Sequence, residues 1–145
     1  MPMPPRLSVV TVGARDLPRL RRFYGALGWH EVAGSGDDWA AYLVGGVLFA
    51  LYPETVLASE SGADTTGPLG WSGVTFACNV DSAGEVDEAI AAAIEAGATV
   101  IAPAASREWG GRSGHIADPE SNRWEIAWAP SARFDSGGSL THFGT

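Results

Sequence analysis

The sequence predicts an α+β fold of two tandem βαβββ modules, whose strands form a curved mixed sheet around a central cavity with the helices on the outside. Three observations predict it. One order of strand and helix patterns occurs twice, short matching sequences recur in the two halves, and a connector rich in Gly, Ser, Thr and Pro separates them. A sheet with a helix on its back leaves its other face uncovered, and pairing two such modules encloses space for a ligand.

The predicted modules span residues 1–58 and 73–130, with the connector at 59–72 and a C-terminal tail without hydrophobic period at 131–145. At 145 residues the chain has the usual size of one domain, so we expect one compact unit. The sequences that match between the modules are Val10-Thr11 with Val74-Thr75, Gly28-Trp29 with Gly97-Ala98, and ALYP with AWAP.

The first module begins with the β-branched run LSVVTV at residues 7–12, which predicts a strand. Asp16 is the expected N-cap of a helix over residues 17–28, with Pro18 in the tolerated first turn and Gly28 at the end. Three further strands are predicted, and the Gly45-Gly46 pair predicts a hairpin turn between the last two. These strands cover residues 29–33, 39–44 and 47–53.

The second module repeats this order. A strand at 73–80 precedes Ser82 and Glu85, whose spacing is a capping-box pattern for a helix that Gly97 ends. The three strands expected after the helix are ATVIAPAA at 98–105, GRSGHIAD at 111–118 and NRWEIAWAP at 122–130.

Composition excludes several functions. A net charge of −8 disfavours nucleic-acid binding, and the absence of lysine excludes Schiff-base chemistry and a P-loop. Cys78, the single cysteine, excludes intrachain disulfides and is either a small buried hydrophobe or a reactive thiol. Without a run of 18 apolar residues or a signal-peptide pattern, no membrane partner is expected and the cytoplasm is the expected compartment. Abundant Ala, Gly and Arg suggest a bacterial source.

Two stretches resemble the vicinal oxygen chelate superfamily, which holds glyoxalase I, extradiol dioxygenases, fosfomycin resistance enzymes and bleomycin resistance proteins. They are VGARDLPRLRRFYGALGW and WGGRSGHIADPESNRWEIAWAP, and the resemblance covers about residues 6 to 130. The second stretch is similar to the family's glycine-containing strand, Asp-Pro turn and final Glu-bearing strand, with Ser121 where glycine is commoner. The resemblance implies the fold and a homodimer, whereas function must be argued from the site.

In metal-dependent members of that superfamily, four inward-facing positions hold a divalent ion. Aligning the motifs places Val9, Leu48, Gly73 and Glu125 at those positions, and of these only Glu125 has a donor atom. Such a catalytic site needs about three N or O ligands beside an open coordination position. The resemblance therefore implies that no metal or other cofactor is held in this way, with a divalent metal on shifted ligands as the alternative.

A hairpin centred on Glu120 would place His115 opposite Glu125 on one face of the sheet. Dioxygenases of the superfamily carry an active-site tyrosine at the position that resembles His115. Three interpretations stay open: a cross-strand pair that satisfies its own polarity, a general acid/base pair, or two ligands of an unusual metal site.

Other residues are candidates for binding a ligand. Trp109, in the loop sequence REWGG, predicts either a mobile lid that stacks on the ligand or a packing anchor for the loop. Arg112 either pairs with an anionic ligand group or is solvated. Trp39 is expected to extend the aromatic wall of the cavity, whereas Trp124 and Trp128 are expected to pack against the helices because they alternate with Glu125.

The leading hypothesis is a metal-independent protein that binds a small apolar or aromatic molecule in its cavity, as bleomycin resistance proteins bind their drug. The alternative is an isomerase, lyase, hydrolase or dioxygenase-type enzyme that uses Glu125 as base or metal ligand. The expected ligand contacts are Val9, Trp39, Leu48, Trp109 and Arg112, and the expected catalytic pair is Glu125 and His115.

Overall fold

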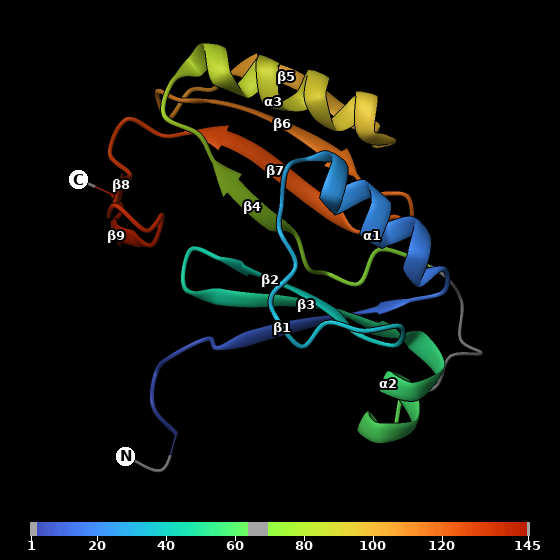
Figure 1. The fold of residues 1–145 in the computed structure, drawn as a ribbon. Coiled ribbons are helices and arrows are strands. Elements are labelled where there is room, and N and C mark those ends of the chain that lie inside the picture. Colours follow the sequence, from blue (N-terminus) through green and yellow to red (C-terminus); the bar gives the residue numbers. More distant parts are fainter. Residues whose placement is uncertain (1–2, 64–69, 145) are drawn as a thin grey trace.

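Two main β-sheets, a two-stranded hairpin and three helices make up the part of the chain that the computed structural model describes, residues 3–63 and 70–144 (Figure 1). The α+β class predicted from the sequence is confirmed. The strands of the main sheets divide into one sheet of three and one of four, each lying on its own side of the molecule. The predicted single curved sheet is thus observed, within one chain, as two sheets.

The first sheet has the order β1-β3-β2, from β1 (Val9–Ala14), β2 (Ala40–Val44) and β3 (Val47–Pro53). Strand β1 runs parallel to β3, and β2 runs antiparallel to it. The turn between β2 and β3 contains Gly45 and Gly46, whose φ values of 58° and 90° lie in the left-handed region that favours glycine. The predicted hairpin is therefore confirmed.

The strand predicted over residues 29–33 is reduced to one isolated bridge between Glu31 and Tyr42. The physical reason lies on helix α1 (Leu17–Ala26). Its Arg21 pairs with Glu31 and donates to the Gly36 carbonyl at 2.6 Å, so this segment bends around a side chain instead of extending along β2. The helix itself begins as predicted, because Asp16 accepts the Arg19 N–H at 3.1 Å.

The second sheet has the order β4-β7-β6-β5 and repeats the parallel pairing of a first strand with a last one. Its strands are β4 (Phe76–Asn79), β5 (Thr99–Ser106), β6 (Arg112–Ala117) and β7 (Arg123–Trp128). Helix α3 (Ala83–Ala96) lies along one face of it, against β5, β6 and β7 (Figure 1). Ser82 caps this helix and Gly97 ends it with φ of 117°, both as expected.

Two elements were not expected from the sequence. Helix α2 (Glu54–Ser61) follows β3 directly, and hairpin β8 (Arg133–Phe134) with β9 (Leu140–His142) occupies the predicted tail. Asp135 closes this hairpin by accepting two backbone N–H groups through Oδ1. Ser139 Oγ donates to the Gly45 carbonyl at 2.8 Å, so the C-terminal hairpin is fastened to the β2–β3 turn.

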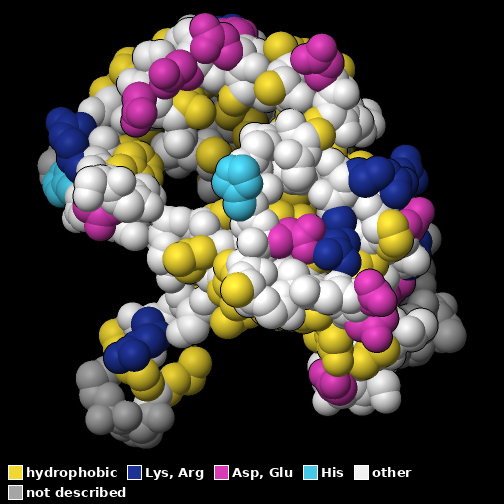
Figure 2. Space-filling model, viewed as in Figure 1, with side chains coloured by type: hydrophobic (Ala, Val, Ile, Leu, Met, Phe, Trp, Pro, Cys, Tyr) yellow, Lys and Arg dark blue, Asp and Glu magenta, His cyan; other side chains and the backbone are white. Residues whose placement is uncertain are grey.

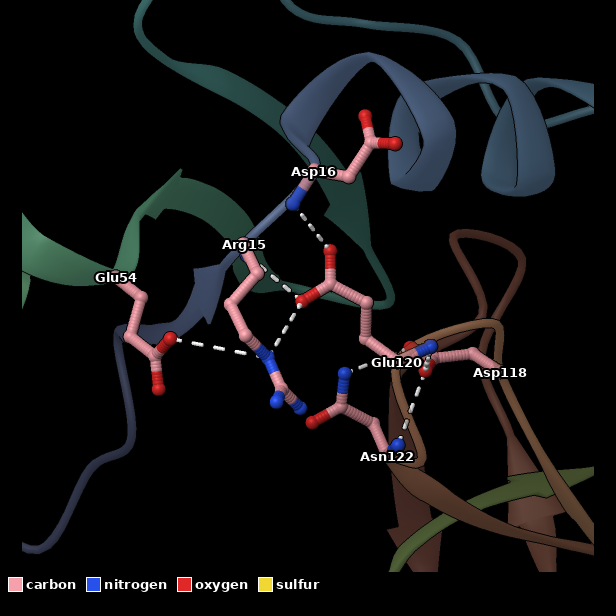
Figure 3. Close-up of polar contacts among 6 residues, drawn as sticks. All are labelled: Arg15, Asp16, Glu54, Asp118, Glu120 and Asn122. Carbon is pink, nitrogen blue, oxygen red and sulfur yellow. Dashed lines mark hydrogen bonds and ion pairs between the residues drawn. The ribbon is translucent and has the colours of Figure 1, made fainter. Parts of the chain in front are cut away.

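The turn between β6 and β7 fastens the second sheet to the start of α1 (Figure 3). The backbone N–H groups of Arg15 and Asp16 donate to the two carboxylate oxygens of Glu120 at 2.7 and 2.8 Å. Behind this contact, the buried Tyr24 hydroxyl donates to Asp118 at 2.7 Å and accepts the Trp124 indole N–H at 3.1 Å. These charge-assisted bonds fix α1 against the second sheet.

Candidate functional site

The side chains of β7 alternate between two faces of the second sheet. Trp124 and Ile126 are buried in the core on the side of α3, whereas Glu125 and Ala127 lie on the other side. We call this second side the open face, because no helix of the described residues covers it. The arrangement agrees with the prediction that the tryptophans of this strand pack against the helices and Glu125 does not.

His115 and Glu125 are register partners on β6 and β7, as the hairpin centred on Glu120 predicts. Their Nε2 and Oε2 atoms are 3.7 Å apart, and their side chains are 36% and 31% exposed. This separation is too long for a strong hydrogen bond but suits an ion pair when the imidazole is protonated. The pair thus presents a carboxylate and an imidazole side by side on the open face.

Trp109 lies in the short loop between β5 and β6, and its ring packs directly over Gly111. A Cβ at position 111 would collide with this ring and with the Trp128 carbonyl. The loop is closed by the Arg107 N–H donating to the Gly111 carbonyl at 2.8 Å, and the Arg107 guanidinium binds Ser113. The base of the loop is therefore anchored, whereas Trp109 as a whole residue stays 56% exposed.

Trp109 and Glu125 line a groove of about 730 Å³, which we call the open-face groove. The C-terminal segment contributes part of its wall, which was not expected from the sequence. The signal was present, since DSGGS between Phe134 and Leu140 is a hairpin turn sequence. The lining residues are Ala77, Asn79, Trp109, Glu125, Ala127, Ala129, Pro130, Ser131, Leu140 and Phe143.

Val9 and Leu48 are neighbours but belong to the first sheet, where they are register partners on the parallel strands β1 and β3. The corresponding partner of Glu125 on β4 is Ala77. Gly73, which the motif alignment assigned to the fourth position, lies before β4, which begins at Phe76, and does not pair with Glu125. Like glycine, alanine has no side-chain atom that can bind a metal.

Two further candidates lie elsewhere. Trp39 is bridged to Gly36 immediately before β2 of the first sheet. Arg112 points to the side of α3, where its guanidinium donates two hydrogen bonds of 2.9 Å to Asp87. These bonds hold the pKa of the Asp87 carboxyl below its usual range. The structure thus brings together Glu125, His115 and Trp109, but not Val9, Leu48, Trp39 or Arg112.

The open face does not fit a divalent metal within one chain. Among the described residues, no three His, Cys, Asp or Glu side chains lie close enough to share an ion. Glu125 and His115 supply two donors, and the neighbouring Ala77 supplies none. This falls short of the three protein ligands that a catalytic site of this kind requires.

Cys78 was expected to be either a small buried hydrophobe or a reactive thiol. Cys78 is partly buried, and burial raises the pKa of its thiol, which favours the packing role over a reactive one. No helix in the described part of the chain combines the length and the apolar character that a membrane crossing needs.

Comparisons with known proteins agree with this architecture. The model of the Glyoxalase/Bleomycin resistance protein/Dioxygenase superfamily matches residues 6–126. A glyoxalase-related enzyme from Fulvimarina pelagi is 30% identical, with a TM-score of 0.87 over 97% of this chain and 99% of that chain. A family enzyme from Burkholderia phytofirmans PsJN is 22% identical, with a TM-score of 0.76 over 83% and 96% of the two chains.

More distant similarity extends to a lactoylglutathione lyase from Agrobacterium tumefaciens. That protein is 22% identical, with a TM-score of 0.63 over 87% of this chain and 95% of that one, a likeness of fold alone. A comparison with curated protein sequences found no match.

Proposed function

The chain belongs to the Glyoxalase/Bleomycin resistance protein/Dioxygenase superfamily, and we propose that it binds a small apolar or aromatic molecule in the open-face groove without a metal ion. One observation carries the proposal. The groove combines alanine and other apolar side chains with the exposed ring of Trp109 and a single carboxylate. Small-molecule sites typically have this mostly apolar lining with few polar groups.

Metal independence rests on the donor set of this chain. Among residues 3–63 and 70–144, Glu125 shares no metal-sized cluster with two other His, Cys, Asp or Glu side chains, and its register partners are Ala77 and His115. The first sheet offers only the aliphatic Val9 and Leu48 at the equivalent register positions. Aliphatic side chains cannot replace the water shell of a cation but do bind apolar ligands.

The groove is open in one chain, and a second copy is the proposed cover. In this homodimer, the first sheet of one protomer lies over the open face of the other, bringing Val9 and Leu48 toward Glu125. The support is apolar surface left uncovered, with Val9, Leu43 and Trp109 all exposed. Light scattering should report twice the chain mass of 15.1 kDa, and a monomer at all concentrations would contradict the dimer.

The experiment for ligand binding is a fluorescence screen of small aromatic and aliphatic molecules, followed by Trp109→Ala. We expect ligands that quench tryptophan fluorescence and bind at least about tenfold more weakly to this variant, because a stacked ring contributes about 1 to 3 kcal/mol. Trp71→Ala is the matched control, since Trp71 is 65% exposed but does not line the groove. Equal affinities for the two variants would remove Trp109 from the site.

A second candidate function is proton transfer, and the His115–Glu125 pair favours it. The Glu125 carboxylate lines the groove and can accept a proton from a substrate, and the imidazole 3.7 Å away can form an ion pair with it when protonated. Under this isomerase or lyase-like function, Glu125→Gln abolishes turnover of a ligand from the screen. If the protein only binds the ligand, neither the wild type nor Glu125→Gln converts it, and the substitution leaves the affinity nearly intact.

A further inference from the structure

A second hollow lies on the opposite face of the second sheet, between that sheet and the helices α1 and α3. Its inner part, which we call the inner chamber, has a volume of about 180 Å³. Its outer part, of about 660 Å³, opens at the β4 edge of the sheet between the β2–β3 turn and the C-terminal hairpin, where Ala77, Asn79 and Leu140 also line the open-face groove. Trp29, Cys78 and Trp124 line both parts, so the two adjoin at these side chains. Figure 2 shows the molecule hollowed beside the C-terminal hairpin.

The inner chamber is apolar. Its walls are the side chains of α1, β6 and β7, with small alanines on the side of α3. The Tyr24 hydroxyl and the Trp124 indole N–H in its aromatic wall are already paired, because the hydroxyl donates to Asp118 and accepts from Trp124. A water molecule inside would therefore find few partners, and apolar cavities of this kind stay dry and accept apolar ligands.

The size of the inner chamber selects the ligand. An apolar cavity of about 150 Å³ holds one benzene molecule, so the inner chamber accepts a single aromatic ring. The rings of Trp29 and Trp124 meet edge to face with centroids 5.7 Å apart, which offers aromatic contacts to such a guest. A fused three-ring molecule would not fit.

The outer part selects the charge of the ligand. Its described lining residues include the carboxylates of Asp81 and Asp135 and no basic side chain. Asp135 already accepts two backbone N–H groups through one oxygen, which keeps its carboxylate in place. Negative charge at the mouth repels an anionic ligand and tolerates a neutral or positive one.

We propose that the inner chamber is a second small-molecule site, separate from the open-face groove, for a molecule with one aromatic ring and a neutral or positively charged end. The ring lies against Trp29, Trp124 and Cys78, and the polar end points to the outer part. The C-terminal hairpin, fastened to Gly45 by Ser139, forms one side of the entrance.

Cys78 provides the test, because it is the single cysteine and lines the chamber. The rate at which methyl methanethiosulfonate modifies it is measured by mass spectrometry with benzyl alcohol, benzylamine or benzoate present. We expect the first two to slow modification saturably and benzoate to have no effect. Ala89→Phe, which fills the chamber from α3, should weaken this protection at least about tenfold, in keeping with the loss of a whole ring contact. Ala91→Phe on the exposed side of α3 should not.

Because a phenylalanine at position 89 can disturb the packing of α3, Ala92→Phe at the rim of the chamber is the second blocking variant, with melting curves to confirm folding. Failure of benzyl alcohol and benzylamine to protect Cys78, or equal protection by benzoate, would overturn the proposal. Protection that is lost in Trp109→Ala but kept in the blocking variants would also overturn it. That last result would place the ligand in the open-face groove and leave the proposed function intact.

Discussion

At the scale of single residues, Ser121 has an unusual backbone. Its φ of 70° is the only positive value at a non-glycine residue in the described ranges 3–63 and 70–144. A residue with a Cβ in this region carries a steric cost of roughly 1 to 2 kcal/mol, which glycine avoids. The backbone therefore explains why glycine is commoner at this position in the resembling turn.

Replacement of Ser121 by glycine should stabilise the protein. The relief of strain is partly offset by the greater freedom of glycine in the unfolded chain, so the expected gain is roughly 0.5 to 1 kcal/mol. Urea denaturation measures it. Ser121→Ala is the control, because alanine keeps the strain, and an equal gain in that variant would refute the explanation.

Because of Tyr24, the protein should become less stable at alkaline pH. Burial, and then Asp118, raise the pKa of its hydroxyl well above the ordinary value near 10. Above about pH 10 the unfolded chain releases this proton while the folded protein retains it. The unfolded state then binds fewer protons, so the free energy of unfolding falls as pH rises toward the folded-state pKa.

Tyr24→Phe tests this directly. At pH 7 the variant should lose about 1 to 3 kcal/mol, because Trp124 loses its acceptor and Asp118 one donor. Between about pH 10 and 11 its stability should fall less steeply than that of the wild type, which narrows the difference. Urea denaturation measures both stabilities over this pH range. If the free energies of unfolding of the wild type and the variant fell in parallel, Tyr24 would not titrate as described.

The pairing of His115 with Glu125 could be predicted from sequence because both positions are equidistant from Glu120 in one hairpin. The ion pair of Arg112 could not be predicted from the sequence. Its partner Asp87 is 25 residues away on α3, and no local pattern links them. The strand predicted from residue 73 begins only at Phe76, because Val74 and Thr75 have β-branched side chains but do not pair with another strand.

At the scale of elements, the helices and strands with clear hydrophobic periods were predictable. Helix α2 was not, because its single buried residue, Ala58, leaves no apolar stripe to recognise. The C-terminal hairpin has two- and three-residue strands, which are too short for a period to be visible. Both elements lie against the first sheet or its turn, so tertiary contacts decide their structure.

The β6–β7 turn is expected to stabilise the folded protein by anchoring helix α1. Glu120 holds two backbone N–H groups at the start of α1, and its side chain is only 8% exposed. Glu120→Gln removes the charge and leaves one oxygen, so we expect a loss of about 1 to 3 kcal/mol. Glu88→Gln, at an exposed position of α3, is the control in thermal or urea denaturation. Equal stability of the two variants would mean that the turn does not anchor α1.

At the scale of the whole molecule, the relative position of the two sheets depends on contacts between distant parts of the chain. The bond from Arg15 to Glu120 joins residues 105 positions apart, and Ser139 reaches Gly45 across 94. Repeat matching indicated two similar halves but could not place one against the other. As the two sheets are placed, the predicted ligand contacts Val9 and Leu48 of the first sheet do not line the open-face groove that contains Glu125 in the same chain.

The central claim is that the open-face groove binds its ligand through apolar and aromatic contacts rather than through a metal held by Glu125. The most direct measurement is a fluorescence titration of the wild type and Glu125→Gln with one ligand from the screen, with and without EDTA. We expect affinities that agree within about threefold in all four titrations, because no contact worth more than about 0.7 kcal/mol is removed. Loss of binding on adding EDTA, restored by a divalent ion in the wild type but not in Glu125→Gln, would contradict it.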